Sequence, residues 1–329
     1  MRAVVITRAG GPDVLEIQQR ERPAPAAREV LVAIRATALN RADLLQREGR
    51  YPPPAGVPAD IPGLEFAGEV AALGDGTSAW RVGDRVFGIT AAGAHAEYVV
   101  VRDDTLAHVP DGMSWDDAGA VPEAFITAHD ALVTQAAVQA GERVLVHAVG
   151  SGVGLVAIQL ARAWNAVPYG TARTDEKIRR AREHGLEEGV AVSSDLEVIP
   201  NAVAAWTGGK GVDITLDLVG GPYVEATIRA SALKARIMLI GTVAGRSATL
   251  PLHLMLAKRI TLRGTILRAR SVDEKATVTR KFADEVVPLI ERGLVAPVID
   301  SVFQLDQIRE AHARLESNET FGKVVVRVS

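Results

Sequence analysis

A glycine-rich turn between a strand-like and a helix-like segment constrains this chain more than any other feature. Residues 144–154 read Val-Leu-Val-His-Ala-Val-Gly-Ser-Gly-Val-Gly, and an apolar helical segment follows. Small residues in such a turn let a diphosphate approach the backbone, and the helix offers that anion free amides and the positive end of its dipole. The alternative is an ordinary strand–helix turn whose glycines serve packing alone. The turn predicts a dinucleotide site formed by Ser151, Gly152, Val153 and Gly154.

The spacing of this turn departs from the strict G-x-G-x-x-G pattern of dinucleotide-binding proteins. Val149 and Ser151 stand where that pattern has its first two glycines. A serine hydroxyl both donates and accepts hydrogen bonds, so Ser151 can offer its hydroxyl to the bound group.

The residues after the next expected strand indicate which dinucleotide is bound. An NAD site usually places a carboxylate there for the ribose 2′-hydroxyl. This chain has Arg173, Thr174 and Lys177, which suit a 2′-phosphate, so we predict NADPH. Two acidic residues follow Thr174, but they could belong only to the first turn of the next helix, and Thr174 could be only its N-cap.

Short apolar strands alternate with helices in the middle of the chain, which is typical of a parallel sheet covered on both faces. The first 120 residues consist mostly of strand-like segments and turns, and the C-terminal tail is too short for a domain of its own. The expected strands are 30–37, 65–73, 97–101, 143–148, 167–171, 212–218, 236–241, 296–302 and 322–328, and the expected helices are 42–46, 122–139, 153–164, 175–184, 272–292 and 305–316.

A proline-rich segment at 49–63 interrupts the strands of the first part. It contains five prolines and three glycines. Proline removes an amide donor and fixes φ, so the segment predicts a rigid loop. A loop of this size either lines a site or is a surface connection.

Composition excludes several classes of function. The net charge is -3, from 37 basic and 40 acidic residues, so no basic excess favours nucleic acid or a membrane surface as partner. The chain has no cysteine, which excludes disulfides, thiolate nucleophiles and cysteine-ligated zinc. No apolar run reaches the length of a transmembrane helix, and the first residues do not resemble a signal peptide. We therefore expect a cytoplasmic protein.

Beyond these patterns, the whole chain resembles the zinc-free quinone oxidoreductases, the zeta-crystallin branch of the medium-chain dehydrogenase/reductases. It is especially similar to the tumour-suppressor-inducible subgroup. The segments that carry the resemblance are 38–46 (Ala-Leu-Asn-Arg-Ala-Asp-Leu-Leu-Gln), 51–54 (Tyr-Pro-Pro-Pro), 63–68 (Gly-Leu-Glu-Phe-Ala-Gly), 122–128 (Pro-Glu-Ala-Phe-Ile-Thr-Ala), the glycine turn and 267–270 (Leu-Arg-Ala-Arg).

The resemblance implies an α/β fold in which a Rossmann domain, a doubly wound parallel sheet, is inserted into a GroES-like β-rich domain. The implied boundaries are 1–121 for the first part of the substrate domain, 122–265 for the NADPH-binding domain, and 266–329 for the return to the substrate domain. The family's active site is the cleft between the two domains. The family is commonly dimeric through its Rossmann sheets, so we expect a homodimer.

The resemblance also implies where the site residues lie. It places Asn40 and Tyr51 on the substrate side, Thr127 near the nicotinamide ribose, Lys177 and Thr174 at the 2′-phosphate, and Gly241 and Lys323 near the cofactor.

A catalytic metal is not expected in this chain. Zinc alcohol dehydrogenases carry Gly-His-Glu where this chain has Gly63-Leu64-Glu65, and leucine cannot bind a metal. The histidines are scattered, and we expect His147 to be a structural residue.

The predicted reaction is NADPH-dependent reduction of a quinone by hydride transfer. Without a metal, a carbonyl must be polarised by hydrogen-bond donors, for which Tyr51 and Asn40 are the candidates. Tyr51 could instead only pack on its own proline loop. Glu123 could start a helix and Arg268 could be a solvated surface charge, so neither is assigned to the site. The alternatives are an enone or enoyl reductase of the same fold and a non-enzymatic, crystallin-like NADPH-binding protein.

Overall fold

The computed structural model describes residues 1–328 and divides the chain into two compact units. Unit 1 combines Met1–Ile126 with the C-terminal segment from Leu267, and unit 2 comprises Thr127–Ile266. The chain thus leaves unit 1, forms unit 2 and returns to unit 1. Each unit has its own sheet and its own core.

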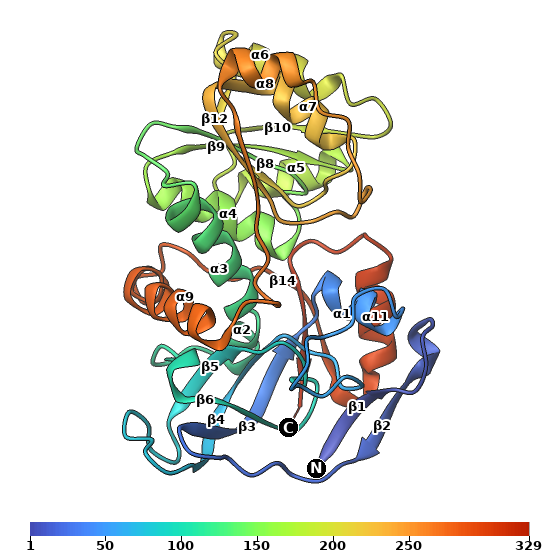
Figure 1. Ribbon diagram of the computed structural model, residues 1–329, viewed down its shortest axis with the longest axis vertical. Helices are drawn as coiled ribbons and strands as arrows, with labels where there is room; N and C mark the ends of the chain where they lie inside the picture. The colour runs from blue at the N-terminus through green and yellow to red at the C-terminus, as the bar shows by residue number, and fades with distance from the viewer. Residues whose placement is uncertain (329) are drawn as a thin grey trace. The chain divides into compact units, whose positions relative to one another are not determined.

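Unit 1 is built on a mixed sheet of seven strands (Figure 1). Its main path runs β14-β15-β3-β4-β5-β7, with β6 also paired to β3. Only β14 and β15 are parallel, and every other pair is antiparallel. A separate antiparallel pair is formed by β1 and β2. The strand bounds are β1 Arg2–Ile6, β2 Leu15–Gln19, β3 Glu29–Ala38, β4 Glu65–Leu73, β5 Arg85–Ile89, β6 Tyr98–Arg102, β7 Leu106–His108, β14 Ile299–Gln304 and β15 Lys323–Arg327.

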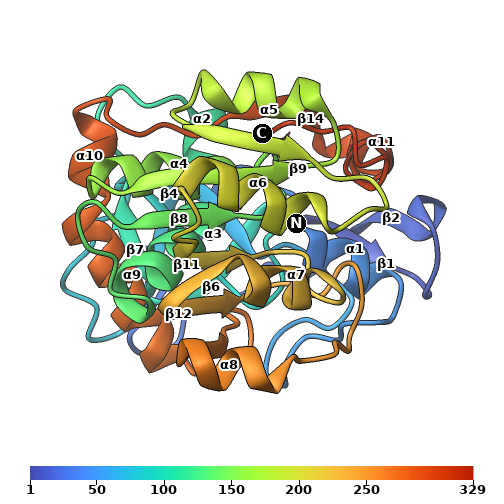
Figure 2. The ribbon, with the colours of Figure 1, turned by 90° about the horizontal axis from the view of Figure 1, so that it is seen from above.

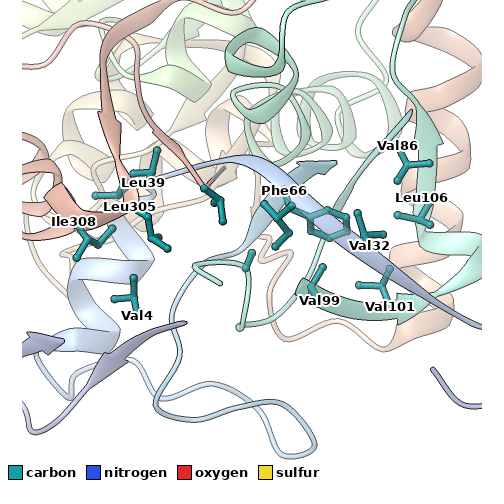
Figure 3. Close-up of a cluster of buried hydrophobic side chains, with 14 of the residues drawn as sticks. Val4, Val32, Leu39, Phe66, Val86, Val99, Val101, Leu106, Leu305 and Ile308 are labelled. Carbon is teal, nitrogen blue, oxygen red and sulfur yellow. The ribbon is translucent and has the colours of Figure 1, made fainter. Parts of the chain in front are cut away.

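Buried apolar side chains from distant parts of the sequence form the core of unit 1. Phe66 on β4 lies among valines of neighbouring strands, including Val32 of β3 and Val99 of β6 (Figure 3). Leu305 and Ile308 bring the C-terminal segment into the same core. Burial of these side chains fastens the returning segment to the N-terminal strands.

The helices of unit 1 are α1 Arg41–Arg47, α2 Trp115–Gly119, α9 Val272–Glu285, α10 Val287–Glu291 and α11 Ile308–Glu316, with 3₁₀ turns η1 Pro12–Val14, η2 Asp103–Thr105 and η4 Leu305–Gln307. The boundary between the two units lies within α3, Pro122–His129. The predicted helix 272–292 is divided into α9 and α10. Pro288 explains the break, because it lacks an amide hydrogen and its ring clashes with the preceding turn.

Unit 2 contains a six-stranded sheet in which every pair is parallel. The strand order β10-β9-β8-β11-β12-β13 is the order 3-2-1-4-5-6 of dinucleotide-binding sheets. Figure 2 shows helices on both sides of these strands, with α5 on one side and α8 on the other. The doubly wound sheet predicted from the sequence is confirmed. The strands are β8 Arg143–Val146, β9 Val167–Ala172, β10 Glu188–Ala191, β11 Val212–Asp217, β12 Ser231–Leu239 and β13 Thr261–Gly264.

The helices of unit 2 are α4 Gly152–Ala163, α5 Asp175–Arg182, α6 Val198–Thr207, α7 Tyr223–Ala230 and α8 Leu252–Lys258. The single helix predicted for 122–139 is wrong in its second half. After α3 the chain forms a π-helix, η3, at Asp130–Gln135, closed by a bond from the Ala136 amide to the Ala131 carbonyl at 3.0 Å. The Gln135 side chain bonds Asp130 and Thr265 there. Within residues 1–328, no helix is both long and apolar enough to cross a bilayer.

Candidate functional site

Asn40 lies where β3 turns into α1, and its side chain is part of a buried polar cluster in unit 1. The backbone amide of Asn40 donates to the Asp43 carboxylate at 2.7 Å, which caps α1. The other oxygen of Asp43 accepts from the Gly63 amide at 3.0 Å. Asp43 therefore holds the end of the proline-rich loop against the start of α1. The segment 49–63 contains no strand or helix, as its composition predicted.

A buried ion pair lies at the centre of this cluster. The Lys323 ammonium donates to Glu65 Oε1 at 2.6 Å, to Asn40 Oδ1 at 2.8 Å and to the Leu39 carbonyl at 3.1 Å. The Asn40 amide nitrogen donates to the same Glu65 oxygen at 2.8 Å. Lys323 and Glu65 are 5% and 0% exposed, so both charges are removed from water. The structure brings Asn40 and Lys323 together, and the three ammonium hydrogens of Lys323 already have acceptors.

Glu123 adds a second carboxyl to the cluster. Its backbone amide donates to Glu65 Oε2 at 2.8 Å, so both oxygens of Glu65 accept hydrogen bonds. Burial, and next the negative charge of Glu65, raise the pKa of the Glu123 carboxyl to about 8, although Lys323 opposes the shift. Glu65 has a cationic partner and Glu123 does not have one as close, so burial acts on the Glu123 carboxyl with less compensation.

Tyr51 lies near the start of the proline loop, and the guanidinium of an arginine covers the face of its ring. The Arg268 guanidinium carbon is 4.8 Å from the centre of the Tyr51 ring. Burial raises the pKa of the Tyr51 phenol, while the positive charge of Arg268 acts in the opposite direction. Arg268 is only 3% exposed, so its interpretation as a solvated surface charge is wrong.

In unit 2, the glycine turn joins β8 to α4 at the carboxyl edge of the sheet. Ser151 is the N-cap of α4, and its hydroxyl accepts from the Gly154 amide at 3.1 Å. A Cβ at Gly154 would lie 2.5 Å from the Ala148 carbonyl oxygen, so packing of the turn itself requires this glycine. Gly152 and Val153 are partly exposed, and the first amides of a helix lack intrahelical acceptors. In this turn, Gly154 is required for packing, and the amides of Gly152 and Val153 are available to bind an anion.

The three residues predicted to choose the dinucleotide lie between β9 and α5. Thr174 is the N-cap of α5 and accepts from the Lys177 amide at 3.3 Å. Arg173 is exposed, and its charge acts on the phenol of Tyr223. The acidic residue Glu176 pairs with Arg179 within the helix. Asp175 and Glu176 both lie in the first turn of α5, where acidic residues are favoured.

The remaining predicted residues of unit 2 lie at other points of the fold. Thr127 is partly exposed on α3. Gly241 follows β12, and a Cβ there would lie 2.3 Å from the Leu218 carbonyl oxygen. His147 is fully buried, bonded to the hydroxyls of Thr171 and Thr227 at 2.9 and 2.8 Å, which fits the structural role expected for it.

Sequence reasoning missed the partners that organise unit 1. Glu65, Glu123 and Arg268 stand inside segments that carry the family resemblance, and this was the available signal. A charged residue in an apolar strand, as Glu65 is in β4, also indicates a buried partner. Among residues 1–328, no group of three or more histidine, aspartate and glutamate side chains is arranged to hold a metal ion.

Comparison with known proteins identifies the family. Residues 26–111 match the alcohol dehydrogenase GroES-like domain, and residues 152–284 match the zinc-binding dehydrogenase family. A quinone oxidoreductase of Pseudomonas aeruginosa is 34% identical over 318 residues, which cover 96% of this chain and 96% of that protein. This chain belongs to the quinone oxidoreductases of the medium-chain dehydrogenase/reductase superfamily. The resemblance expected from the sequence is confirmed, as is the GroES-like and Rossmann fold class.

Solved structures of this quinone oxidoreductase family and its neighbours share the whole fold. A crystal structure of an NAD-dependent alcohol dehydrogenase is 33% identical with a TM-score of 0.87, and covers 100% of both chains. A mycobacterial protein complexed with NADPH is 28% identical with a TM-score of 0.89, again over 100% of both chains. Family membership therefore assigns oxidoreduction of a small molecule with a nicotinamide cofactor.

The raised pKa of Glu123 makes the stability of this family member depend on pH. Between about pH 4.3 and about pH 8, the Glu123 carboxyl is mostly protonated in the folded protein and mostly ionised in the unfolded chain. The free energy of unfolding should therefore fall as pH rises through this window. We predict that Glu123→Gln removes this fall, and that above pH 8 its free energy of unfolding exceeds that of the wild type by up to about 5 kcal/mol, because each unit of the pKa shift corresponds to about 1.36 kcal/mol.

Urea unfolding at about pH 5 and about pH 9 measures the difference. Glu225→Gln is the matched control, because Glu225 also lies in the first turn of an eight-residue helix but is exposed. Equal pH dependence in the wild type and Glu123→Gln would show that Glu123 is ionised throughout.

Proposed function

We propose that this chain catalyses the NADPH-dependent, zinc-independent reduction of quinones. The observation that carries the proposal is its relationship, over nearly the whole length of both chains, to a quinone oxidoreductase. The polar cluster of unit 1 and the glycine turn of unit 2 supply residues suited to this reaction. A cytoplasmic location remains a prediction.

The residues of unit 2 fit a dinucleotide. The close approach of Gly154 to the Ala148 carbonyl brings the start of α4 against the end of β8 without an intervening side chain. The amides of Gly152 and Val153 would hold the diphosphate, with the helix dipole contributing. Thr127 and Gly241 would lie at the nicotinamide end, as the family resemblance implies.

The 2′-phosphate of NADPH would be held by Arg173, Thr174 and Lys177. Two basic residues suit a dianion, and the nearby carboxylates, Asp175 and Glu176, lie in the first turn of α5. A related protein was solved with NADPH, whereas another structural neighbour is described as NAD-dependent, so the family does not decide the preference.

Unit 1 supplies the groups for the acceptor. When bound, the reduced nicotinamide supplies the hydride. Tyr51 would donate its phenol hydrogen to the oxyanion that develops on the quinone. The Asn40 side chain is already hydrogen-bonded to Glu65 and Lys323, so we propose that its main role is to hold this cluster together. To bind the substrate, the Asn40 amide would have to give up one of these two hydrogen bonds.

A metal is not needed for this chemistry. Leu64 is 2% exposed and stands where zinc enzymes of the superfamily carry a histidine ligand. The Lys323 ammonium, bonded to Glu65, provides a fixed positive charge in the same cluster. We propose that this internal cation takes the place of a metal ion in balancing the carboxylates.

The cofactor preference gives a direct prediction. Replacing both Arg173 and Lys177 by alanine removes two charge-assisted contacts to the 2′-phosphate, so KM for NADPH should rise about 10- to 100-fold while KM for NADH stays the same. Steady-state kinetics with each cofactor measures this. Arg179→Ala is the control, because Arg179 lies on the same helix but pairs with Glu176. An equal rise for both cofactors would contradict the assignment.

An acceptor panel tests the reaction itself. We predict that NADPH oxidation is fastest with ortho- or para-quinones and slower with alkyl enones, and that Tyr51→Phe lowers kcat by about tenfold because the oxyanion loses a donor. Greater kcat/KM with enones would favour a double-bond reductase. Binding of NADPH without turnover on any acceptor would favour the crystallin-like role.

We also propose a homodimer formed through unit 2. Among residues 1–328, β13 pairs only with β12, which leaves one edge of the sheet open. Leu252 and Leu256 of α8 are 63% and 78% exposed. Light scattering at micromolar concentration should give twice the 34.9 kDa of one chain, and Leu256→Asp should weaken the dimer. Val82→Asp, at a residue 65% exposed in unit 1, is the control. A monomeric wild type would contradict the proposal.

A further inference from the structure

Arg268 is a buried cation without a carboxylate partner. Nε donates to the Ala91 carbonyl at 2.7 Å, one terminal nitrogen to the Tyr51 carbonyl at 3.0 Å, and the other to the side-chain oxygen of Gln46. All three acceptors are neutral. Among residues 1–328, no carboxylate lies within ion-pairing distance of this guanidinium. Burial lowers the pKa of Arg268, which reflects the cost of keeping the charge from water.

The guanidinium holds the proline loop at both of its ends. It bonds the Tyr51 backbone directly, and it bonds Gln46, whose amide nitrogen donates to the Ala59 carbonyl at 3.0 Å. Because the loop between these points is rich in proline, fixing its ends fixes the direction in which Tyr51 leaves the backbone. The same guanidinium covers the face of the Tyr51 ring.

An unpaired buried charge destabilises a fold, and neutral residues could fill this place at lower cost. Structural support of the loop needs hydrogen bonds but no net charge. A positive charge beside a phenol has a different effect, because it favours negative charge on the phenol oxygen and strengthens that phenol as a hydrogen-bond donor. The carboxylates of Asp43 and Glu123 also interact with this charge through space, but Tyr51 is the ionisable group whose ring the guanidinium covers, which points to Tyr51 as a group on which the charge acts.

We propose that Arg268 is a positioning residue that orients Tyr51 and makes its phenol a stronger hydrogen-bond donor to the substrate oxyanion. The contribution of Arg268 to turnover rests on the proposed function, whereas its effect on the ionisation of Tyr51 does not. Burial and the partner Glu123 oppose the ionisation of Tyr51, and Arg268 is the cation that favours it.

The test measures the ionisation of Tyr51 separately from activity. The chain has four tyrosines, so ¹³Cζ-labelled tyrosine gives few resonances, and Tyr51→Phe identifies the one that belongs to Tyr51. In Arg268→Met the ionisation midpoint of Tyr51 should rise by about one pH unit or more. Arg268→Lys, which keeps the charge but loses the planar fork, should shift it less. Both variants should lower kcat by about tenfold with little change in KM for NADPH.

Arg22→Met is the matched control, because Arg22 lies 4.2 Å from the centre of the Tyr98 ring but is exposed. It should leave the Tyr51 midpoint and kcat unchanged. If Arg268→Met does not fold, the neutral Arg268→Gln, which keeps a hydrogen-bond donor, takes its place. A folded, neutral Arg268 variant with the wild-type midpoint would overturn the proposal, even if it were less stable, because a role in loop support alone predicts that result. If Arg268→Met shifts the Tyr51 midpoint but Tyr51→Phe keeps full turnover, the effect of Arg268 on Tyr51 is supported and the proposed catalytic use of the Tyr51 phenol is rejected.

Discussion

The buried ion pair between Lys323 and Glu65 is the interaction on which the polar cluster of unit 1 depends. It joins β15, near the end of the chain, to β4, and it sets the positions of the Asn40 amide and the Glu123 backbone. Removal of one partner from such a pair leaves an unpaired buried charge, which typically costs about 3 to 5 kcal/mol. Each charge here is well bonded, so the pair is tolerated in the interior of the unit.

The chain divides its chemistry between two units. Unit 2 has the strand order and glycine turn of a dinucleotide-binding sheet, and its basic residues lie at the carboxyl edge where such sheets bind ligands. Unit 1 has two polar contacts that involve a buried cation: the Lys323–Glu65 ion pair and the Arg268–Tyr51 contact. Lys323 is hydrogen-bonded to Asn40 and Arg268 covers Tyr51, and both of these neighbours are proposed to serve the reduction. This arrangement fits a reductase that polarises its acceptor without a metal.

Much of unit 2 could be predicted from sequence because its signals are local. Alternating strands and helices identified the parallel sheet, and Thr174 is the N-cap of α5, as the sequence allowed. The π-helix after α3 was missed, because its i→i+5 bonds and the Gln135 side chain depend on tertiary partners. Unit 1 was less predictable for the same reason. Arg268 and Gln46 are far apart in the sequence, and no local pattern around Arg268 indicates that its charge is buried.

We propose above all that the cations of the reducing centre are the side chains of Lys323 and Arg268, and that no metal ion is bound there. The most direct measurement is the metal content of the purified protein by mass spectrometry, combined with quinone turnover before and after exhaustive chelation. We predict far less than one zinc ion per chain and turnover that chelation leaves unchanged. About one bound zinc ion per chain, with activity lost on its removal and regained on its return, would contradict it.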